Sequence, residues 1–240
     1  LRGLSATSAE RLARSIIVGD GAISTEDIER ISKAKAELMD LGGVLHYEFE
    51  TAKFEDVAGL VHLKHWVQER KNAFLVSASS NKKQLDFPKG IMLLGVQGSG
   101  KSLAAKAVAG SLNLPLLRLD IASLYNKYIG QSEANLKRAF LLADKMAPAV
   151  LWIDEIEKSI HNGDDADNGT SKRILGMMLT WMSERKKPVF IVATSNDVSQ
   201  LPPELIRKGR LDEMFFVDLP AEKMRVDIFK IHLKKRELDE

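Results

Sequence analysis

A glycine-rich segment has the residue types and the spacing of a phosphate-binding loop. Gly95 to Ser102 reads Gly-Val-Gln-Gly-Ser-Gly-Lys-Ser, which fits the pattern G-x-x-x-x-G-K-[ST]. The segment follows an apolar run and precedes a helical pattern, as such a loop must. Its glycines allow backbone N–H groups to turn toward phosphate oxygens, and the start of the next helix adds a positive dipole end. A glycine-rich turn without function is the alternative, and the surrounding strand and helix patterns disfavour it.

The residues of this loop have separate expected roles. We expect Lys101 to reach the β- and γ-phosphates of a nucleotide and Ser102 to ligate Mg²⁺. The residues expected to contact the nucleotide here are Gly98, Ser99, Gly100, Lys101, Ser102 and Leu103. The loop therefore predicts a site for ATP and Mg²⁺.

Two adjacent carboxylates, Asp154 and Glu155, follow the apolar run at residues 150–153. A strand of this kind delivers a magnesium-binding aspartate beside a phosphate-binding loop, and we assign that role to Asp154. Glu155 stands where a carboxylate could polarise the attacking water, so its presence favours hydrolysis over binding alone. An acidic pair that only caps a helix is the alternative, because Glu157 shows that acidic residues are frequent here.

A polar amide, Asn196, follows another apolar run at residues 189–193. An asparagine at the end of a buried strand could hold the attacking water or a γ-phosphate oxygen. Asparagine is also a common turn former, and Asn196-Asp197 resembles the start of a loop. The local pattern alone favours the turn.

The elements that must position these residues alternate between two patterns. Near-continuous apolar runs, which indicate buried strands, occur at residues 91–94, 115–119, 150–153, 189–193 and 214–217. Helical patterns intervene at about residues 101–112, 132–146 and 171–185. Buried strands separated by helices predict a parallel sheet that is covered on both faces, which is a three-layer α/β fold.

The first part of the chain has a different character. Residues 1–40 read as a small helical unit, broken by Gly19-Asp20-Gly21. Residues 41–52, which contain Gly42-Gly43, read as a linker to the main domain.

Composition says little about partners. The chain of 240 residues has 35 Lys and Arg against 33 Asp and Glu, and no cysteine. A formal net charge of +2 does not indicate a nucleic-acid or membrane partner, and the lack of cysteine excludes disulfides and Cys-ligated zinc. No apolar run reaches the roughly 18 residues that cross a bilayer. We expect an internal, soluble location, and we read a chain that opens on Leu1 as an excerpt of a longer protein.

Taken together, these motifs resemble those of the AAA+ ATPases and of the narrower AAA subgroup. The segment FEDVAGL, residues 54–60, precedes the phosphate-binding loop, and the strand ending Asp154-Glu155, the strand ending at Asn196 and the segment 201–212 follow in the family's order. The resemblance covers about residues 54–240. It implies a P-loop NTPase sandwich with a parallel five-stranded sheet of order 5-1-4-3-2. It also implies a large α/β domain at residues 53–220 and the start of a helical lid at 221–240.

The resemblance implies roles for residues that the local patterns leave open. In a sheet of this order the Asn196 strand lies between the two strands that carry the nucleotide motifs, which makes Asn196 the family's sensor-1 residue. Val57 and Gly59 correspond to residues that flank the adenine through backbone contacts.

Arg207 and Arg210 correspond to the family's arginine fingers. Such arginines complete the nucleotide site of a neighbouring subunit, and a guanidinium near the γ-phosphate stabilises charge in the transition state. The resemblance thus implies a homo-oligomer, a hexameric ring. A surface arginine pair bonded to Asp212 or Glu213 is the alternative.

Tyr128-Ile129-Gly130 lies between the second strand and a helix, where AAA proteins carry a loop that faces the central pore. The three residues resemble the family's aromatic-hydrophobic-glycine pattern, which grips a polypeptide by packing. Tyr128 and Ile129 are therefore candidates for contact with a protein substrate. An ordinary core tyrosine is the alternative.

A closer similarity is to AAA proteins of unknown role that algal plastids and cyanobacteria encode as open reading frames. It is carried by residues 94–103, 116–120, 150–156 and 201–210. In that group a degenerate AAA-like domain precedes the active one, so residues 1–40 resemble its helical end. A cytoplasmic or plastid stromal location would follow.

The leading hypothesis is an ATP-driven ring that remodels or unfolds a protein substrate through a central pore. A nucleic-acid loader or motor is one alternative; Lys127 favours it, and Tyr128 and Ile129 argue against it. A nucleotide-gated scaffold with slow hydrolysis is the other. The sequence does not indicate the substrate or an adaptor.

Overall fold

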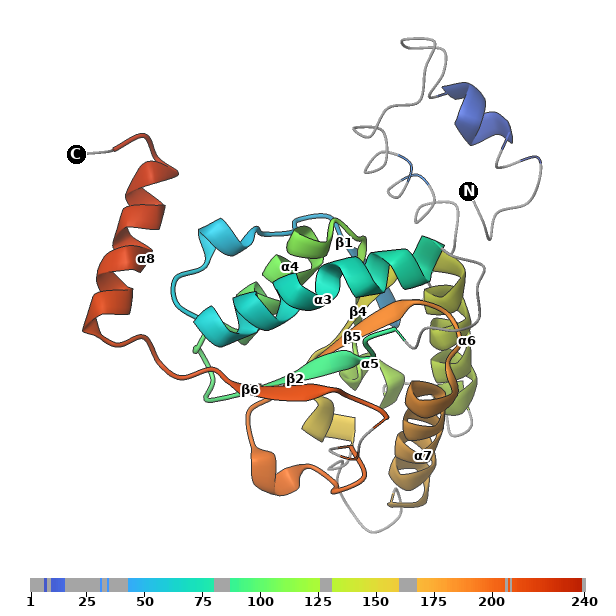
Figure 1. The fold of residues 1–240 in the computed structure, drawn as a ribbon. Coiled ribbons are helices and arrows are strands. Elements are labelled where there is room, and N and C mark those ends of the chain that lie inside the picture. The colour runs from blue at the N-terminus through green and yellow to red at the C-terminus, as the bar shows by residue number, and fades with distance from the viewer. Residues whose placement is uncertain are drawn as a thin grey trace.

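A six-stranded sheet forms the centre of the molecule (Figure 1). The computed structural model describes residues 7, 10–15, 31, 34, 43–79, 87–125, 131–159, 168–205, 207 and 209–238. In order across the sheet the strands are β1 (Leu45–Glu48), β3 (Leu116–Leu119), β4 (Ala149–Ile153), β5 (Val189–Ser195), β2 (Gly90–Leu94) and β6 (Glu213–Phe216). Only the pairing of β1 with β3 is antiparallel.

Helices connect these strands within the described ranges. The α-helices are α3 (Val61–Ser79), α4 (Lys101–Leu112), α5 (Ala122–Tyr125), α6 (Gln131–Met146), α7 (Asn168–Glu184) and α8 (Glu222–Lys234). The short 3₁₀ turns are η1 (Phe54–Asp56), η2 (Ile156–Ser159) and η3 (Val198–Gln200).

The predicted fold class is confirmed. When β1 is set aside, the five parallel strands have the predicted order 5-1-4-3-2, counted along the chain and read from β6 to β3. Every residue of β2, β4 and β5 is buried, which explains why these strands stand out in the sequence as continuous apolar runs.

Several elements, among them β1 and α3, were not predicted. β1 lies inside the predicted linker 41–52 and pairs with β3 from Leu45 opposite Leu119 to Glu48 opposite Leu116. It is an edge strand in which only Leu45 is buried, so its apolar pattern is too weak to recognise. Helix α3 buries Leu63, Trp66 and Phe74, but it also exposes the apolar Val61, which blurs its apolar stripe.

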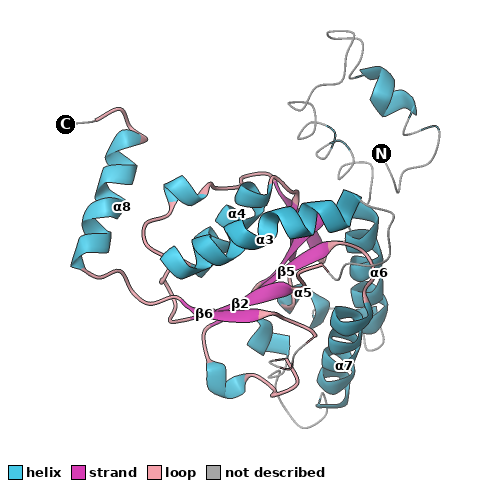
Figure 2. Cartoon of the chain, in the orientation of Figure 1, coloured by secondary structure: helices cyan, strands magenta, loops and turns pink. Residues whose placement is uncertain are grey.

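The sheet has a helical layer on each face (Figure 2). On one face α3 and α4 pack against Ile91 and Leu93 of β2, in a cluster that also contains Trp152 and Phe190. On the other face α6 and α7 pack against the alternate residues of the same strands, including Met92. Successive side chains of a strand point to opposite faces, so each strand contributes to both clusters.

Helix α8 stands away from the sheet (Figure 1). Lys235, just after the helix, forms an ion pair of 2.8 Å with Asp56 of η1. Met224 packs over Gly59, where a Cβ atom would lie 2.3 Å from the Met224 Cε. The predicted start of the lid therefore contacts the segment that contains Val57 and Gly59.

The predicted helical unit at residues 1–40 falls mostly outside the described residues. Residues 10–15 are helical, as are the single described positions 7, 31 and 34. The domain boundaries at 40, 52 and 220 remain predictions.

Candidate functional site

The phosphate-binding loop joins the end of β2 to the start of α4. Gly98 and Gly100 have φ angles of +81° and +96°, a left-handed conformation that favours glycine. A Cβ atom at either position would meet no atom within 4 Å, so both glycines border open space. A Cβ at Gly95, in contrast, would lie 2.0 Å from the carbonyl oxygen of Val217. Gly98 and Gly100 thus leave room for a ligand, while Gly95 allows the backbone after β6 to approach closely.

The N-terminus of α4 faces this loop. No side chain caps the helix, because its N-cap residue is Gly100. The first N–H groups of a helix have no partner within the helix, and together with the helix dipole they make a site for an anion. The Oγ of Ser99 is buried and has no hydrogen-bond partner among the described residues. The N–H groups of this helix end and the Ser99 hydroxyl are suited to donate hydrogen bonds to phosphate oxygens.

Lys101 is the cation of the loop. Its side chain is only 7% exposed, and its Nζ donates to the carbonyl oxygens of Gly95 (2.7 Å) and Val96 (2.8 Å). Burial lowers the pKa of Lys101, and the nearby carboxylates of Glu157, Asp154 and Glu155 oppose that lowering. A buried ammonium group held by two neutral carbonyls fits an anionic ligand.

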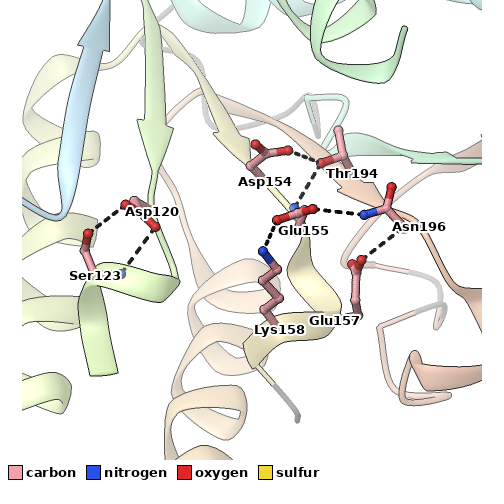
Figure 3. Close-up of polar contacts among 8 residues, drawn as sticks. All are labelled: Asp120, Ser123, Asp154, Glu155, Glu157, Lys158, Thr194 and Asn196. Atoms are coloured by element: carbon pink, nitrogen blue, oxygen red, sulfur yellow. Dashed lines mark hydrogen bonds and ion pairs between the residues drawn. The ribbon is translucent and has the colours of Figure 1, made fainter. Parts of the chain in front are cut away.

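The ends of β4 and β5 bring two of the predicted catalytic residues, Glu155 and Asn196, together (Figure 3). The strands pair in parallel with Ile153 opposite Ala193, so the residues that follow lie at one edge of the sheet. The Nδ2 of Asn196 donates to Glu155 Oε1 at 3.0 Å. The structure therefore places Asn196 against the carboxylate predicted to activate water.

Thr194 contacts both residues that follow β4, through the side chain of Asp154 and the backbone N–H of Glu155. Its Oγ1 donates to Asp154 Oδ1 at 2.7 Å and accepts from the backbone N–H of Glu155 at 3.1 Å. Thr194 has no role of its own in the motifs recognised in the sequence. It precedes Asn196 by two residues, and the two-residue period of a strand puts both side chains on the same side, which is a signal that could have found it.

The 3₁₀ turn η2 adds two more residues to the cluster. Lys158 Nζ forms an ion pair with Glu155 Oε2, and this contact raises the pKa of Lys158. Glu157 is 7% exposed, and its Oε1 accepts from the backbone N–H of Asn196 at 3.0 Å. In the sequence Glu157 stands out only as one more acidic residue beside Asp154 and Glu155.

The donors available for Mg²⁺ are few. No group of three or more His, Asp or Glu residues suited to a metal occurs in the described part of the chain. Ser102 is exposed and Asp154 is half-buried, so each has oxygen atoms within reach of solvent. This donor set fits Mg²⁺, which keeps several waters and commonly binds one or two protein groups together with substrate phosphates.

The two predicted arginine fingers lie away from the chain's own phosphate-binding loop. Arg207 and Arg210 line a groove of about 800 Å³ together with Pro88 and Lys89, which directly precede β2. The loop follows the other end of β2, and five residues of strand span roughly 16 Å. The arginines and the loop are thus at opposite ends of one strand.

The side-chain partner of Arg210 differs from the predicted alternative, a bond to Asp212 or Glu213. Arg210 Nη1 donates to the carbonyl oxygen of Glu204. Asp212 Oδ2 accepts from the backbone N–H groups of Lys89 (2.6 Å) and Gly90 (3.0 Å). Asp212 therefore anchors the start of β2.

The residues predicted to flank the adenine lie in the described part of the chain, whereas those predicted to contact a substrate do not. Val57 is buried and Gly59 has a φ of +67°, and both lie between η1 and α3 beside α8. The candidates for substrate contact, Tyr128 and Ile129, fall outside the described residues, which omit 126–130.

The fold and the site together define a class of protein. The chain has a three-layer α/β fold, with a G-x-x-x-x-G-K-[ST] loop after one strand of its sheet and an Asp-Glu pair after another. These features define a P-loop nucleoside triphosphatase. Residues 91–219, over half of the chain, match the family described as "ATPase family associated with various cellular activities (AAA)". The chain belongs to the AAA family of ATPases.

Similar proteins confirm the predicted resemblance. The "Uncharacterized AAA domain-containing protein ycf46" of Guillardia theta is 43% identical over 235 residues, which cover 98% of this chain and 46% of the relative. The protein of the same name from Gracilaria tenuistipitata var. liui is 44% identical, over 95% of this chain and 47% of the relative. A "Cell division cycle protein 48 homolog" of Archaeoglobus fulgidus is 34% identical, over 80% of this chain and 27% of the relative.

The matches also extend into the first part of the chain. Residues 1–41 match the family described as "SpoVK-like AAA ATPase, second domain". The chain spans about half the length of the ycf46 relatives. Among the described residues, no helix is both long and apolar enough to span a membrane.

Proposed function

We propose that this chain hydrolyses ATP to ADP and phosphate with the help of Mg²⁺, and that a hexameric ring of such chains uses the reaction to remodel or unfold a protein. One observation carries the enzymatic part: the Glu155 carboxylate is held by Asn196 at the sheet edge that also presents Asp154. A base for water beside a metal-binding carboxylate favours hydrolysis over binding alone.

The phosphate-binding loop and helix α4 hold the triphosphate in this proposal. Backbone N–H groups of residues 98–102 bind phosphate oxygens, and Lys101 exchanges its contacts with Gly95 and Val96 for the β- and γ-phosphates. Ser102 and Asp154 hold Mg²⁺, which when bound neutralises charge on the phosphate oxygens.

Glu155 and Asn196 act on the water. Asn196 fixes the orientation of Glu155 through the hydrogen bond to Oε1. The water oxygen attacks the γ-phosphorus, the bond from that phosphorus to the bridging oxygen of ADP breaks, and the water proton passes to the Glu155 carboxylate. Lys158 on Oε2 has to release this oxygen if the proton is to bind there.

The site is completed by a second copy of the chain. Arg207 and Arg210 lie at the opposite end of β2 from the loop, so they are poorly placed to reach a nucleotide bound to the same chain. A head-to-tail contact, repeated around a closed ring, would bring this end of one chain to the loop of the next. The guanidinium groups would then stabilise the charge of the transferring phosphoryl group.

The protein substrate, the domains and the location are proposed from the similarity to other proteins. The similarity to the "ATP-dependent zinc metalloprotease FtsH" of Karelsulcia muelleri, which is 33% identical over 85% of this chain and 32% of the relative, supports a protein substrate. In this proposal Tyr128 and Ile129 grip that substrate. The match of residues 1–41 supports a preceding AAA-like domain, with the α/β domain at 53–220 and a lid from 221. The similarity to the ycf46 proteins supports the cytoplasm or the plastid stroma as the location.

A substitution of the proposed base tests this function. We expect Glu155→Gln to lower the rate of ATP hydrolysis by about 100-fold or more, because a general base contributes about that much, while ATP affinity stays within about three-fold. The exposed Glu50→Gln serves as a matched control and should retain the wild-type rate. Full hydrolysis by Glu155→Gln would contradict the assignment of the base.

The same variant tests the ring. Because it binds ATP without consuming it, Glu155→Gln should form an ATP-dependent oligomer that retains bound protein in a pull-down. A variant that stays monomeric with ATP, while the wild type is active, would contradict the ring.

A further inference from the structure

We infer that Glu157 is a positioning residue for ATP hydrolysis, which holds the main chain of Asn196 so that the Asn196 amide meets Glu155. The inference rests on the proposed function, since it assigns a residue to the same reaction.

The main chain at Asn196 lies beyond the sheet. Strand β5 ends at Ser195 and η3 begins at Val198, so neighbouring strands do not supply a ladder partner for the Asn196 N–H. That N–H instead donates to Glu157 Oε1 at 3.0 Å. A hydrogen bond to a carboxylate is among the stronger ones, so it fixes the strand end at this point.

The local fold of η2 brings Glu157 to this position. Glu155 has a φ of +49°, which is uncommon for a residue with a side chain, and the N–H of Lys158 donates to the Glu155 carbonyl oxygen at 2.9 Å. This turn buries Ile156 and leaves Glu157 only 7% exposed. Glu155 and Glu157 therefore both point to the end of β5 from one tight turn (Figure 3).

A buried carboxylate is costly unless it is compensated, so its presence here needs a reason. Glu157 Oε2 is buried and has no hydrogen-bond partner among the described residues. Of the three carboxylates near Lys101, Glu157 is the one that most strongly opposes the lowered pKa of this lysine. Glu157 thus lies near enough to Lys101 to favour the charged form of that lysine.

Asn196 is consequently held at two points. Its backbone N–H binds Glu157, and its side-chain Nδ2 binds Glu155 at 3.0 Å. Displacement of a catalytic group by about 1 Å can cost on the order of 100-fold in rate. Loss of the Glu157 contact should therefore slow the reaction without removing the groups that bind ATP.

Three substitutions separate the hydrogen bond from the charge. Glu157→Gln keeps the length and an accepting oxygen but removes the charge. Glu157→Asp keeps the charge but shortens the side chain by about 1.5 Å. Glu157→Ala removes both.

We expect kcat for ATP to fall by about 10- to 100-fold in Glu157→Asp and Glu157→Ala, and by less than about three-fold in Glu157→Gln. KM and the affinity for ATP should change by less than about three-fold in all variants, since the loop is intact. If Glu157→Ala fails to fold, the comparison of the Asp and Gln variants still decides. A Gln variant as slow as the Asp variant, or a parallel rise of KM, would overturn the inference.

A double variant tests whether Glu157 acts through Asn196. In an Asn196→Ala background, we expect Glu157→Asp to lower kcat by less than about two-fold further, because residues that act as a unit are not additive. Independent, multiplying losses would overturn the inference. Wild type and Glu155→Gln are measured in parallel: a wild type without ATPase activity would refute the proposed function itself, whereas an active wild type with unaffected Glu157 variants would refute this inference alone.

Discussion

The carboxylates of Asp154 and Glu155 are neighbours in the sequence but have different partners in the structure. Asp154 accepts from the Thr194 hydroxyl, whereas Glu155 accepts from the Asn196 amide and pairs with Lys158. Both residues also contact Thr194, because the backbone N–H of Glu155 donates to the same hydroxyl. At the scale of residues, Thr194 thus links the side chain of Asp154, the proposed ligand of Mg²⁺, to the main chain of Glu155, the proposed base.

We predict that Thr194→Val impairs the use of Mg²⁺. Valine has nearly the shape of threonine but lacks the hydroxyl, so Asp154 loses a donor and the Glu155 N–H loses an acceptor. A Mg²⁺ titration of ATP hydrolysis should show a lower kcat, by about 10-fold, and a higher Mg²⁺ concentration at half-maximal rate. Thr194→Ser, which retains the hydroxyl, should resemble wild type. An unchanged Mg²⁺ titration for the Val variant would contradict the role of Thr194.

The types of the main site residues could be predicted from the sequence, but their partners could not. Lys101, Asp154 and Glu155 belong to motifs whose spacing carries chemistry. The contact of Glu157 with Asn196, in contrast, joins residues 39 positions apart and depends on the turn at η2 and the register of β4 with β5. A single sequence contains no signal for that register.

At the scale of elements, the start of the phosphate-binding loop, just after β2, lies against the backbone that follows β6. The N–H of Val217 donates to the Leu94 carbonyl oxygen at 2.6 Å, just before Gly95. The close approach at Gly95 fixes where the loop leaves the sheet. Gly95 therefore has a structural role that differs from that of Gly98.

We predict that Gly95→Ala destabilises the fold more than Gly98→Ala does. The added Cβ at residue 95 would lie 2.0 Å from a backbone oxygen, which cannot move without shifting β6, and we expect a cost of about 2 to 4 kcal/mol. At residue 98 the space is open, and only the left-handed backbone costs about 1 kcal/mol. Urea denaturation without nucleotide measures both. Equal losses would contradict the role of Gly95.

Element prediction succeeded where the apolar pattern is clear, including at β6, which is mostly exposed. Helix α4 begins and ends at the predicted residues 101 and 112, and each of the five predicted strands is present. β1 and α3 were missed because an edge strand and a helix with a blurred apolar stripe have mixed patterns. The order of the sheet was implied by family resemblance; local pattern predicts strands but not their neighbours.

At the scale of the whole molecule, the two halves of the proposed catalytic site lie at opposite ends of β2. The phosphate-binding loop follows the strand, and the groove with Arg207 and Arg210 adjoins the residues that precede it. A single chain thus presents a nucleotide site at one end and arginines at the other. Such a chain is suited to head-to-tail assembly, in which each contact makes one complete site.

Mixing two inactive variants tests this central claim most directly. Lys101→Ala disables the loop and Arg210→Ala disables the arginine, and each alone should have almost no ATPase activity. In randomly mixed rings half of the sites have an intact loop, and half of those face an intact arginine, so an equal mixture should recover about one quarter of the wild-type rate. A mixture that stays as inactive as its components, beside an active wild type, would contradict a site shared between two chains.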